Sequence, residues 1–455
     1  MPISLSSVAE SRAASPTSPA VAPQFSAIHS HKTFNAPPHQ ADKILPPKSS
    51  VHSSQTSEIV REHPLRILVA PSGFKESLGP ERVANAIEAG VRNVLSSSSV
   101  ILRKLPLHDG GEGFARAVVV AHGGVIVDQA VTGPVGSLVE SHLGFISDDK
   151  GTAVLDVAAA AGLRLVPKDA RDPTKTTIYG VGELIKKALD AGCSKIIIGC
   201  GDSGTSDGGA GMLQALGVRL LDIDGKELPN ADGGRSLYRL ANLFWCGVHP
   251  RLRKDAIQIE AVCNIKNFLC GPRGVARVYG PQKGATPEEV DLLAAALEQL
   301  AQVVSLTFGK EISRIPGIGA SGGIGTGLLL LGAKLRDRSE AINEYFELDR
   351  VFEEDWDFVI TAEGSLDFQS PHGKMTTEIA RRAKNNGAQV VALAGSIGDG
   401  ADDCYDAGIK AFTSILKGPL TLEEAIAQTE TLVMDGAEKV MRMIMVGLTL
   451  GLSLK

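Results

Sequence analysis

The strongest signal for chemistry is a glycine-rich stretch near the middle of the chain. Residues 199–212, which we call the glycine-rich loop, read GCGDSGTSDGGAGM and place two serines, a threonine and two aspartates among six glycines. Backbone N–H groups of such a stretch, set between a buried strand and a helix, bind anions such as phosphates. A tight turn alone explains only one or two of these glycines, so we predict an anion-binding loop. The residues expected to contact the ligand are Gly201, Ser203, Thr205, Ser206, Gly208 and Gly209.

Asp207 lies among these donors. A carboxylate at that place repels a phosphate unless it holds a metal ion or takes a proton from a hydroxyl group. Either role suits phosphoryl transfer. We therefore predict that Asp207 is catalytic, as a general base or as the group that orients the attacking hydroxyl.

Two lysines occur on loops next to predicted elements. Lys75 lies in PSGFKES, which follows an apolar run at residues 65–70. An exposed turn lysine is the ordinary interpretation, but its position between a buried strand and a helix favours a catalytic role. Lys283 in GPQKGA is either a phosphate contact or a solvated loop charge, and we predict the phosphate contact.

A second polar stretch, AEGSLDFQSPHGK at residues 362–374, follows the apolar run DFVIT. Glu363 and Asp367 could coordinate a metal ion, while Ser370 and Lys374 could bind a phosphate; a polar surface loop is the alternative. Asp109 in HDGGEG is a third candidate metal ligand. A carboxylate on such a glycine turn also commonly caps the next helix, and both interpretations remain open.

Known nucleotide-binding motifs are poorly matched. Gly317, Gly319 and Gly322 have the G-x-G-x-x-G spacing, but no strand pattern precedes them. The chain has no G-x-x-x-x-G-K-[ST] motif and lacks the protein-kinase motifs. A nicotinamide-dependent oxidoreductase therefore stays as an alternative, and phosphoryl transfer would use another architecture.

Alternating strands and helices must position these loops. Apolar runs at residues 65–70, 195–200, 357–364 and 389–396 each lead into small residues, and helical patterns follow the first two. This alternation predicts an α/β fold with parallel sheet, in which ligands bind outside the carboxyl ends of the strands. Residues 125–157 instead hold closely spaced strand patterns without helices, which predicts a second domain of antiparallel or mixed sheet.

Composition excludes several classes of protein. With 46 basic and 52 acidic residues, the net charge of −6 argues against a chain-wide surface for nucleic acid or anionic lipid. The six cysteines lack C-x-x-C spacing, so we expect no zinc site, no disulfide framework and a cytoplasmic location. The longest apolar runs fall short of the roughly 20 residues that cross a bilayer. Residues 1–62, rich in Ser, Pro, Ala and His, are predicted to be a disordered extension rather than an organelle-targeting peptide.

Twelve motifs, in order from about Arg66 to about Met441, resemble those of the glycerate kinases of the bacterial GarK type. They are FKES, DGGEG, VTGPVG, AAAAGL, TTIYGVGELI, SDGGAGMLQALG, NFLCG, GPQKGATPE, GASGGIG, EGSLD, QSPHGK and LAGS. The resemblance implies ATP-dependent, Mg²⁺-requiring phosphorylation of glycerate to 2-phosphoglycerate, with glycerate and ATP as ligands. It also adds Gly322 and Gly323 to the expected binding residues.

The resemblance further implies a two-domain arrangement. A flavodoxin-like or Rossmann-like, doubly wound parallel-sheet domain would comprise residues 63–107 and 317–455. An inserted α/β domain of mixed sheet would comprise residues 108–316, with the active site in the interdomain cleft. The sequence does not set the oligomeric state, and a homodimer is one option.

The chain departs from the family pattern where that pattern usually has aspartate. Ser72 and Asn264 replace two of these aspartates. Asp202 is an additional carboxylate, at a position of the glycine-rich loop where the family pattern has none. We keep as a hypothesis that Asp202 compensates for one loss. The replacements also leave open a non-catalytic sensor of nucleotide or glycerate.

Overall fold

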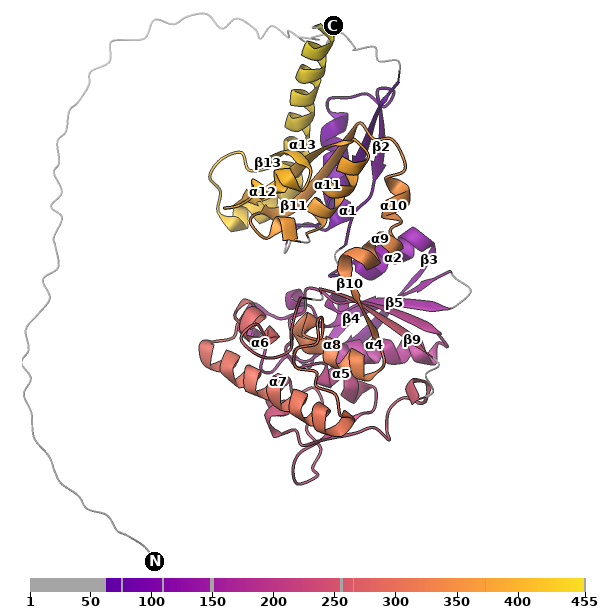
Figure 1. The fold of residues 1–455 in the computed structure, drawn as a ribbon, viewed down its shortest axis with the longest axis vertical. Coiled ribbons are helices and arrows are strands. Elements are labelled where there is room, and N and C mark those ends of the chain that lie inside the picture. Colours follow the sequence, from indigo (N-terminus) through magenta and orange to yellow (C-terminus); the bar gives the residue numbers. More distant parts are fainter. Residues whose placement is uncertain are drawn as a thin grey trace, which may run out of the picture. The chain divides into compact units, whose positions relative to one another are not determined.

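The computed structural model describes residues 63–74, 77–108, 110–147, 151–253, 257–264, 266–372 and 374–453 (Figure 1). In these ranges the strands form sheets of five, six and two strands, with helices packed on the larger two. The predicted α/β class is confirmed. The predicted disordered extension, residues 1–62, lies outside the described residues.

The five-stranded sheet is built from strands near both ends of the chain. All neighbouring strands in it are parallel. Their order is β2 (Val100–Lys104), β1 (Leu65–Val69), β11 (Phe358–Leu366), β12 (Gln389–Ile397) and β13 (Ile409–Ser414). Numbered within the sheet this order is 2-1-3-4-5, the flavodoxin-like order, so the strand order reverses between β1 and β11.

Helices cover this sheet because each presents one apolar face. Val83, Ile87 and Val91 lie on the buried face of α1 (Pro80–Arg92), which packs with α13 (Leu422–Ser453) against β1 and β12. A Cβ atom on Gly90 of α1 would lie 2.2 Å from the carbonyl oxygen of Met434, so only glycine allows this close helix contact. Buried residues of α11 (Met375–Asn385) and α12 (Asp403–Asp406) belong to a second hydrophobic cluster, separate from that of α1 and α13.

The six-stranded sheet has mixed direction. Its order is β10 (Lys334–Asp337), β9 (Gln258–Cys263), β6 (Lys195–Gly199), β5 (Thr152–Asp156), β4 (Leu138–Ile146) and β3 (Gly124–Thr132). The first four strands are parallel, whereas β4 pairs antiparallel with both of its neighbours. The antiparallel part predicted for residues 125–157 is therefore confirmed. The sheet continues to β10, past residue 316, and the predicted domain boundaries stay a prediction.

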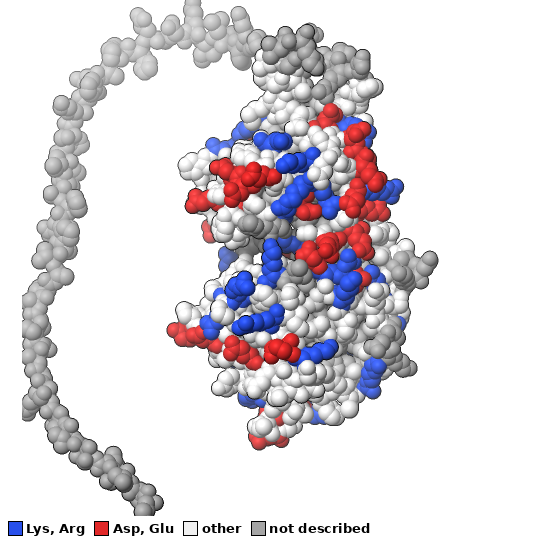
Figure 2. Space-filling model, viewed as in Figure 1, with Lys and Arg blue, Asp and Glu red and all other residues white. Residues whose placement is uncertain are grey.

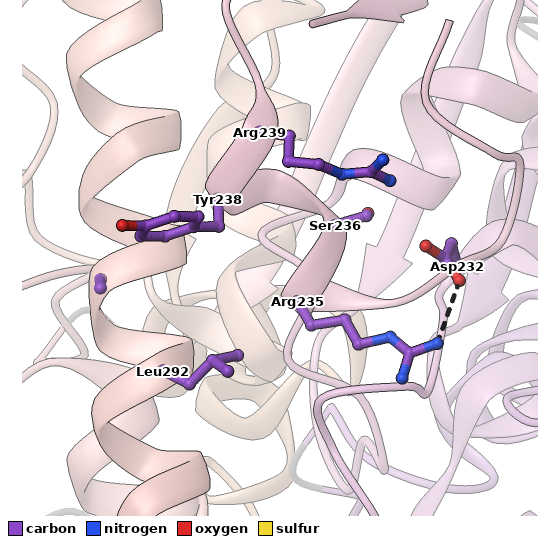
Figure 3. A pocket seen from close by; sticks show the side chains of 7 residues that line it. Asp232, Arg235, Ser236, Tyr238, Arg239 and Leu292 are labelled. Carbon is purple, nitrogen blue, oxygen red and sulfur yellow. Dashed lines mark hydrogen bonds and ion pairs between the residues drawn. The ribbon is translucent and has the colours of Figure 1, made fainter.

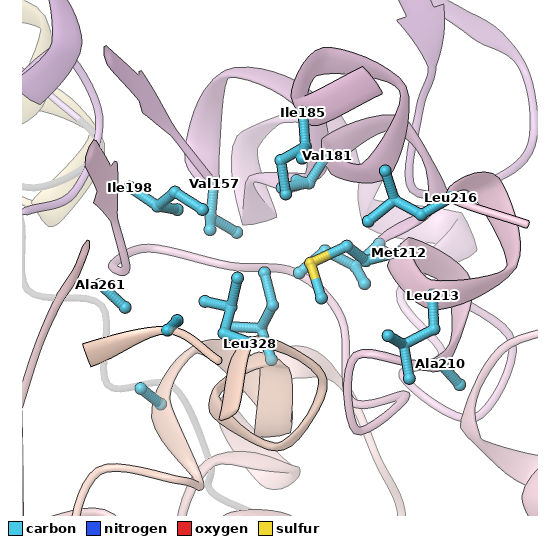
Figure 4. Packing of buried hydrophobic residues seen from close by; sticks show 14 of the residues in the cluster. Val157, Val181, Ile185, Ile198, Ala210, Met212, Leu213, Leu216, Ala261 and Leu328 are labelled. Carbon is cyan, nitrogen blue, oxygen red and sulfur yellow. The ribbon is translucent and has the colours of Figure 1, made fainter. Parts of the chain in front are cut away.

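Alternate residues of β6 face opposite helix layers. Ile196 and Ile198 pack with one core cluster, which Figure 4 shows around Met212 and Leu328, whereas Ile197 belongs to another. The helices of the first cluster include α4 (Tyr179–Asp190), α5 (Ala210–Ala215), α7 (Pro287–Phe308) and α8 (Ala320–Leu330). Those of the second include α2 (Phe114–His122), α9 (Arg338–Tyr345) and α10 (Leu348–Val351).

α7 begins with a capping box. Thr286 accepts a hydrogen bond from the Glu289 N–H, and the Glu289 side chain accepts one from the Thr286 N–H, which completes a capping box. Among the described residues, α7 is the one helix long and apolar enough to cross a membrane by length and composition. Its buried residues, Leu293, Leu297 and Leu300 among them, pack in the core.

The remaining elements are short. They are α3 (Ala158–Ala161), α6 (Val275–Tyr279), β7 (Arg219–Leu221), β8 (Asn242–Phe244) and the 3₁₀ turns η1 (Leu163–Leu165), η2 (Lys168–Ala170), η3 (Gly234–Arg239), η4 (Pro250–Arg253), η5 (Pro281–Lys283) and η6 (Ser370–His372). Basic and acidic side chains are interspersed on the face shown in Figure 2, which agrees with the small net charge of −6.

Candidate active site

The carboxylate of Asp207 in the glycine-rich loop is engaged by hydrogen bonds inside the protein. It accepts hydrogen bonds from the N–H groups of Ile178 at 2.9 Å, Gly209 at 3.2 Å and Gly211 at 3.3 Å, and from the Thr177 hydroxyl at 3.2 Å. Burial raises the pKa of Asp207, and these donors work against that rise. The side chain therefore ties the loop to the start of α4, and its predicted role as a base stays a prediction.

Lys283 of η5 reaches the same loop. Its Nζ donates to the Ser203 hydroxyl at 3.1 Å and to the carbonyl oxygen of Thr205. Burial lowers the pKa of Lys283 to about 7, against the opposing charge of Asp207. The ammonium group thus holds loop atoms together and is buried, which differs from the alternative of a solvated loop charge. The predicted phosphate contact stays a prediction.

The first residues of α8 touch the glycine-rich loop backbone to backbone. Ser321, Gly322 and Gly323 have φ angles of 47°, 74° and 95°. A Cβ atom on Gly322 would lie 1.9 Å from the carbonyl oxygen of Thr205, and the Gly208 N–H donates to the Gly322 carbonyl at 3.0 Å. This close approach accounts for the two glycines without a ligand, so their role as ligand contacts is still a prediction.

Several buried hydroxyl groups of this region have no hydrogen-bond partner among the described residues. They are the side chains of Thr205, Ser206, Ser321 and Thr326. Leaving such a group unpaired costs about 1–3 kcal/mol. A bound water molecule or a polar group of a ligand would satisfy them. This is the observation that favours ligand binding at Thr205 and Ser206.

The glycine-rich loop is open to solvent only near its start. Asp202 is exposed, Gly201 is half-buried, and residues 203–210 are buried. Asp202 accepts a hydrogen bond from the Glu112 N–H at 3.3 Å, and Glu112 forms an ion pair with Arg164. Burial raises the pKa of Glu112, Arg164 opposes the rise, and Asp156 and Asp202 add to it.

Two of these charged residues, Arg164 and Asp156, are not among the site residues predicted from the sequence. Arg164 lies in an apolar stretch and contacts Glu112 only through the fold. Asp156 ends β5, is fully buried and accepts hydrogen bonds from the N–H groups of Ala159 at 2.8 Å and Ala115 at 3.3 Å. It connects the starts of two helices, and its place at the end of a strand pattern is the signal that could have found it.

The stretch that ends β11 brings three predicted site residues together. Lys374 Nζ lies 3.6 Å from Glu363 Oε1 and 3.5 Å from Asp367 Oδ1, and it donates to the Ser365 carbonyl at 2.7 Å. The side chains of Glu363, Asp367 and Lys374 are 18%, 25% and 22% exposed. This half-open group differs from the buried environment of Asp207.

A neighbouring hydroxyl group and a backbone N–H hold these carboxylates in place. The Thr376 hydroxyl donates to Glu363 Oε2 at 2.7 Å, and the Gln369 N–H donates to Asp367 Oδ1 at 2.9 Å. Burial would raise the pKa of Asp367, but the Gln369 N–H and the charge of Lys374 outweigh it and hold the pKa below its usual value. The hydroxyl of Ser370 accepts a hydrogen bond from the Asp367 N–H at 3.0 Å, so this residue shapes the turn.

The group lies beside the reversal of strand order in the five-stranded sheet. Ser72, which follows β1, donates from both its N–H and its hydroxyl to the Ala362 carbonyl, at 2.9 and 3.0 Å. Ala362 directly precedes Glu363 in β11. Ligands of open α/β sheets bind at such a reversal, outside the carboxyl ends of the strands. The charges of this group, its partial exposure and its position therefore all favour ligand binding here.

The remaining predicted site residues cannot be placed. Lys75 and Asp109 lie outside the described residues. Within the described ranges, no group of three or more His, Cys, Asp or Glu side chains is arranged to hold a metal ion. Glu363 and Asp367 nevertheless converge on one cation, the Lys374 ammonium, and so offer carboxylate oxygens of the kind that hard metal ions bind. The metal assignment stays a prediction.

Comparison with known proteins gives consistent matches. The family model described as "Glycerate kinase family" matches residues 67–445. A glycerate kinase of Bacillus subtilis (strain 168) is 42% identical over 362 residues, covering 79% of this chain and 93% of the relative. A glycerate 2-kinase of Escherichia coli (strain K12) is 41% identical, with the same two coverages of 79% and 93%.

A solved structure is also similar over most of its length. It is a crystal structure from Salmonella typhimurium LT2, provisionally assigned as glycerate kinase 2, with a TM-score of 0.66 and 40% identity. The match covers 84% of this chain and 99% of that chain. The similarity therefore extends over both large sheets.

Proposed function

The chain belongs to the glycerate kinase family and is a kinase, and from this premise we propose that it transfers the γ-phosphoryl group of ATP to the 2-hydroxyl of glycerate. The product is 2-phosphoglycerate. Relatives named as glycerate kinase and glycerate 2-kinase support this substrate and this hydroxyl. We further propose that the enzyme is cytoplasmic and that its active site lies in the cleft between a flavodoxin-like domain and an inserted domain.

The observation that carries the proposal is the position of Lys374 between Glu363 and Asp367. The three side chains are partly exposed at the carboxyl end of β11, next to the reversal of strand order. A lysine binds phosphate as a point charge, and carboxylates can share a divalent cation with phosphate oxygens. The group therefore contains the charges that a transferring phosphoryl group requires.

Phosphoryl transfer asks mainly for positioning and charge neutralisation, because its transition state is loose. Lys374 would neutralise phosphate oxygens, and Thr376 and Gln369 would keep the two carboxylates oriented through their hydrogen bonds. Lys75, predicted next to the same sheet edge, would add a second positive charge. Holding both substrates in line accounts for much of the rate enhancement.

Glu363 and Asp367 are the residues that would hold Mg²⁺. Their oxygens fit its preference, since Mg²⁺ is usually bound by one or two carboxylates together with substrate phosphates. When bound, Mg²⁺ supplies positive charge that stabilises the developing charge on the phosphoryl oxygens. Lys374, which contacts both carboxylates in the structure, would then turn to the phosphates.

The glycine-rich loop contributes in a different way. The buried contacts of Asp207 and Lys283 fix its backbone, so that Gly201 and Asp202 are presented at its open end. The hydroxyl groups of Thr205 and Ser206, which have no hydrogen-bond partner in the part of the chain that the structure describes, offer polar contacts to a ligand or to ordered water. Asp207 accordingly acts as a positioning residue, and its role as a base is tested in the Discussion.

The test is a coupled ADP-release assay on the full chain with D-glycerate, ATP and Mg²⁺, followed by ³¹P NMR of the product. We expect ADP release that requires both glycerate and Mg²⁺, and a phosphorus resonance at the 2-position. ATP binding without turnover would support the sensor instead. A nicotinamide absorbance change without Mg²⁺ dependence would support the oxidoreductase.

A Mg²⁺ titration of Glu363→Gln tests the metal assignment separately. We expect the Mg²⁺ concentration at half-maximal activity to rise about tenfold or more, and calorimetry to show weaker Mg²⁺–ATP binding, because one oxygen ligand becomes an amide. Glu354→Gln is the control, since Glu354 pairs with Arg66 and Arg103 and takes no part in this group. An unchanged Mg²⁺ requirement in Glu363→Gln would remove the residue from the metal site.

A further inference from the structure

The β3 edge of the six-stranded sheet is unpaired. β3 is the last strand of that sheet, and among the described residues only β4 pairs with it. Figure 1 shows β3 at the margin of the sheet, with α2 beside it. The outer side of such a strand presents a row of backbone N–H and C=O groups to which another strand can bond. With nine residues, β3 has a long row of this kind.

Hydrogen bonds at the two ends of the β3–β4 hairpin show which groups of β3 point inward. At one end the Ser147 N–H donates to the Gly123 carbonyl at 3.0 Å, and at the other the Gly133 N–H donates to the Ser137 carbonyl at 2.7 Å. Residues bonded to the neighbouring strand alternate along an antiparallel ladder, and the register of β3 with β4 has no shift between these ends. The odd-numbered residues of β3 therefore bond to β4.

The even-numbered residues of β3 point the other way. The Thr132 N–H donates to Glu183 of α4 at 2.6 Å rather than to β4. The N–H and C=O groups of Gly124, Ile126 and Asp128 likewise face outward, and no hydrogen bond joins them to any other residue that the structure describes. These three outward positions are therefore free to bond to another strand.

Exposed apolar side chains flank this edge. Val125 and Val127 of β3 are 60% and 46% exposed, and Val120 of α2 is 82% exposed. Arg116, one turn before Val120, pairs with Asp128 of β3 at 3.5 Å, so Val120 lies on the side of α2 that faces β3. The edge therefore offers apolar contacts in addition to its backbone groups.

β3 also lacks the features that keep an edge strand single. Its nine residues, GVIVDQAVT, include no lysine and no proline, and its register with β4 has no bulge. Its one charged residue, Asp128, is paired with Arg116 of the same chain. Edge strands of natural proteins carry lysine, proline or bulges to prevent pairing with other chains. Their absence from β3 indicates an edge that is used for pairing.

The sequence of β3 is complementary to itself when two copies run antiparallel. Pairing centred on Ile126 places this residue opposite its counterpart, Val125 opposite Val127, and Asp128 opposite Gly124. The outward groups of the even-numbered residues then meet, as an antiparallel ladder requires. β-branched residues directly opposite each other stabilise such a ladder, and the two Asp128 carboxylates do not face each other. The edge therefore suits a second copy of itself.

We propose that β3 pairs antiparallel with β3 of a second copy of this chain, about a two-fold axis at Ile126, with Val120 of α2 adding apolar contact beside it. The six-stranded sheets of the two copies then form one continuous sheet. A two-fold contact uses the same surface on both copies and is closed, so pairing through β3 ends at a dimer. The proposal is independent of the kinase activity.

The oligomeric state of the full chain, measured by sedimentation velocity over a range of concentrations, tests the pairing. We expect a dimer whose dissociation constant rises about tenfold or more in Val127→Lys, because a lysine on an edge strand opposes pairing. Tyr238→Lys is the control and should dimerise as the wild type does. Tyr238 is 67% exposed and extends towards α7 in Figure 3, so it matches Val125 in exposure but lies outside β3.

Circular dichroism shows whether each variant is folded. Asp128→Pro is a second variant, since proline is tolerated in an edge strand where the N–H faces outward. It removes one donor to the second copy and should also weaken the dimer. A wild type that stays monomeric at its highest soluble concentration would overturn the proposal. A dimer of unchanged affinity in both Val127→Lys and Asp128→Pro would overturn it as well.

A mixture of two variants tests the register. Val127→Lys and Val125→Glu should each dimerise weakly alone, whereas their mixture should form a heterodimer about tenfold more tightly, because the new charges lie directly opposite each other. A mixture as weak as either variant alone would overturn the centre at Ile126.

Hydrogen exchange resolved to single amides tests the same edge without a substitution. The amides of Ile126 and Asp128 should exchange at least tenfold more slowly in the dimer than after dilution to the monomer, because only the second copy protects them. The amide of Val127 bonds to β4 and should be protected equally in both states. Exchange at Ile126 and Asp128 that does not depend on concentration would contradict the proposed pairing.

Discussion

The loops that follow β6 and β11 contain the same kinds of residue in opposite surroundings. In the first, Asp207 and Ser206 are 2% and 0% exposed. In the second, the side chains of Glu363 and Lys374 are 18% and 22% exposed. Glycine and carboxylate residues, each with a lysine in contact, thus build a rigid support at one loop and an accessible charged group at the other. Burial, rather than residue type, separates the two roles.

The largest expected effect is on turnover, from Lys374→Met. Removing the charge that contacts both carboxylates should lower kcat about 10²- to 10³-fold, the usual cost of losing one electrostatic contact to a transition state. The ADP-release assay measures it. Lys384→Met in α11 is the control, since among the described residues the Lys384 ammonium hydrogen-bonds only to the Asp406 carbonyl, at 3.4 Å. Turnover within threefold of wild type would show that the open loop is not the reaction centre.

Asp207→Asn distinguishes support from catalysis in the buried loop. The new amide NH₂ group faces N–H donors, so we expect the free energy of unfolding to fall by about 1–3 kcal/mol. Urea titration measures this loss, with Asp224→Asn in an exposed turn as the control. A variant of wild-type stability without turnover would instead identify Asp207 as the general base.

Gly322→Ala tests the close approach of α8 to the same loop. Gly322 and Gly332 have φ angles of 74° and 79°, but a Cβ atom meets the Thr205 carbonyl only at Gly322 and meets nothing within 4 Å at Gly332. The difference between Gly322→Ala and Gly332→Ala therefore isolates the steric clash. We expect it to be about 1–3 kcal/mol in the free energy of unfolding. Equal losses would mean that the loop and α8 can separate freely.

The smallest expected effect is a pH dependence from Lys283. Its pKa in the folded protein is about 7, below the ordinary lysine value of 10.5, so between these two values the unfolded chain binds a proton that the folded chain does not. Raising the pH then favours the folded state. From pH 7 to 8 the stability of the wild type relative to Lys283→Met should rise by about 1 kcal/mol. Parallel stability curves would show that Lys283 stays charged.

Local patterns in the sequence predicted the elements well. The apolar runs at residues 65–70 and 389–396 form parallel strands, as predicted. These features depend on neighbouring residues and on turn chemistry, which the sequence displays directly. The position of Glu363 at the end of a strand was visible for the same reason.

The surroundings of the glycine-rich loop could not be predicted in this way. The residues that pack on this loop include Lys283, Gly322 and Gly234. They belong to other segments of the chain, and nothing in the sequence around them indicates the contact. The pairing of Glu112 with Arg164 likewise arises only in the folded chain. A sequence pattern therefore identified reactive residue types but not which of them remain accessible.

The topology of the five-stranded sheet affects how the chain folds during its synthesis on the ribosome. Its first strands are made early, yet the hydroxyl of Thr361 in β11 bonds to Ala70, 291 residues away. The strands of the six-stranded sheet, residues 124–337, are all synthesised in between. The six-stranded sheet can therefore assemble before β11 is available to pair with β1. Until then β1 and β2 have unpaired strand edges, and such edges are prone to aggregation. Nascent chains arrested before residue 358 should therefore depend on chaperones more than the finished protein does.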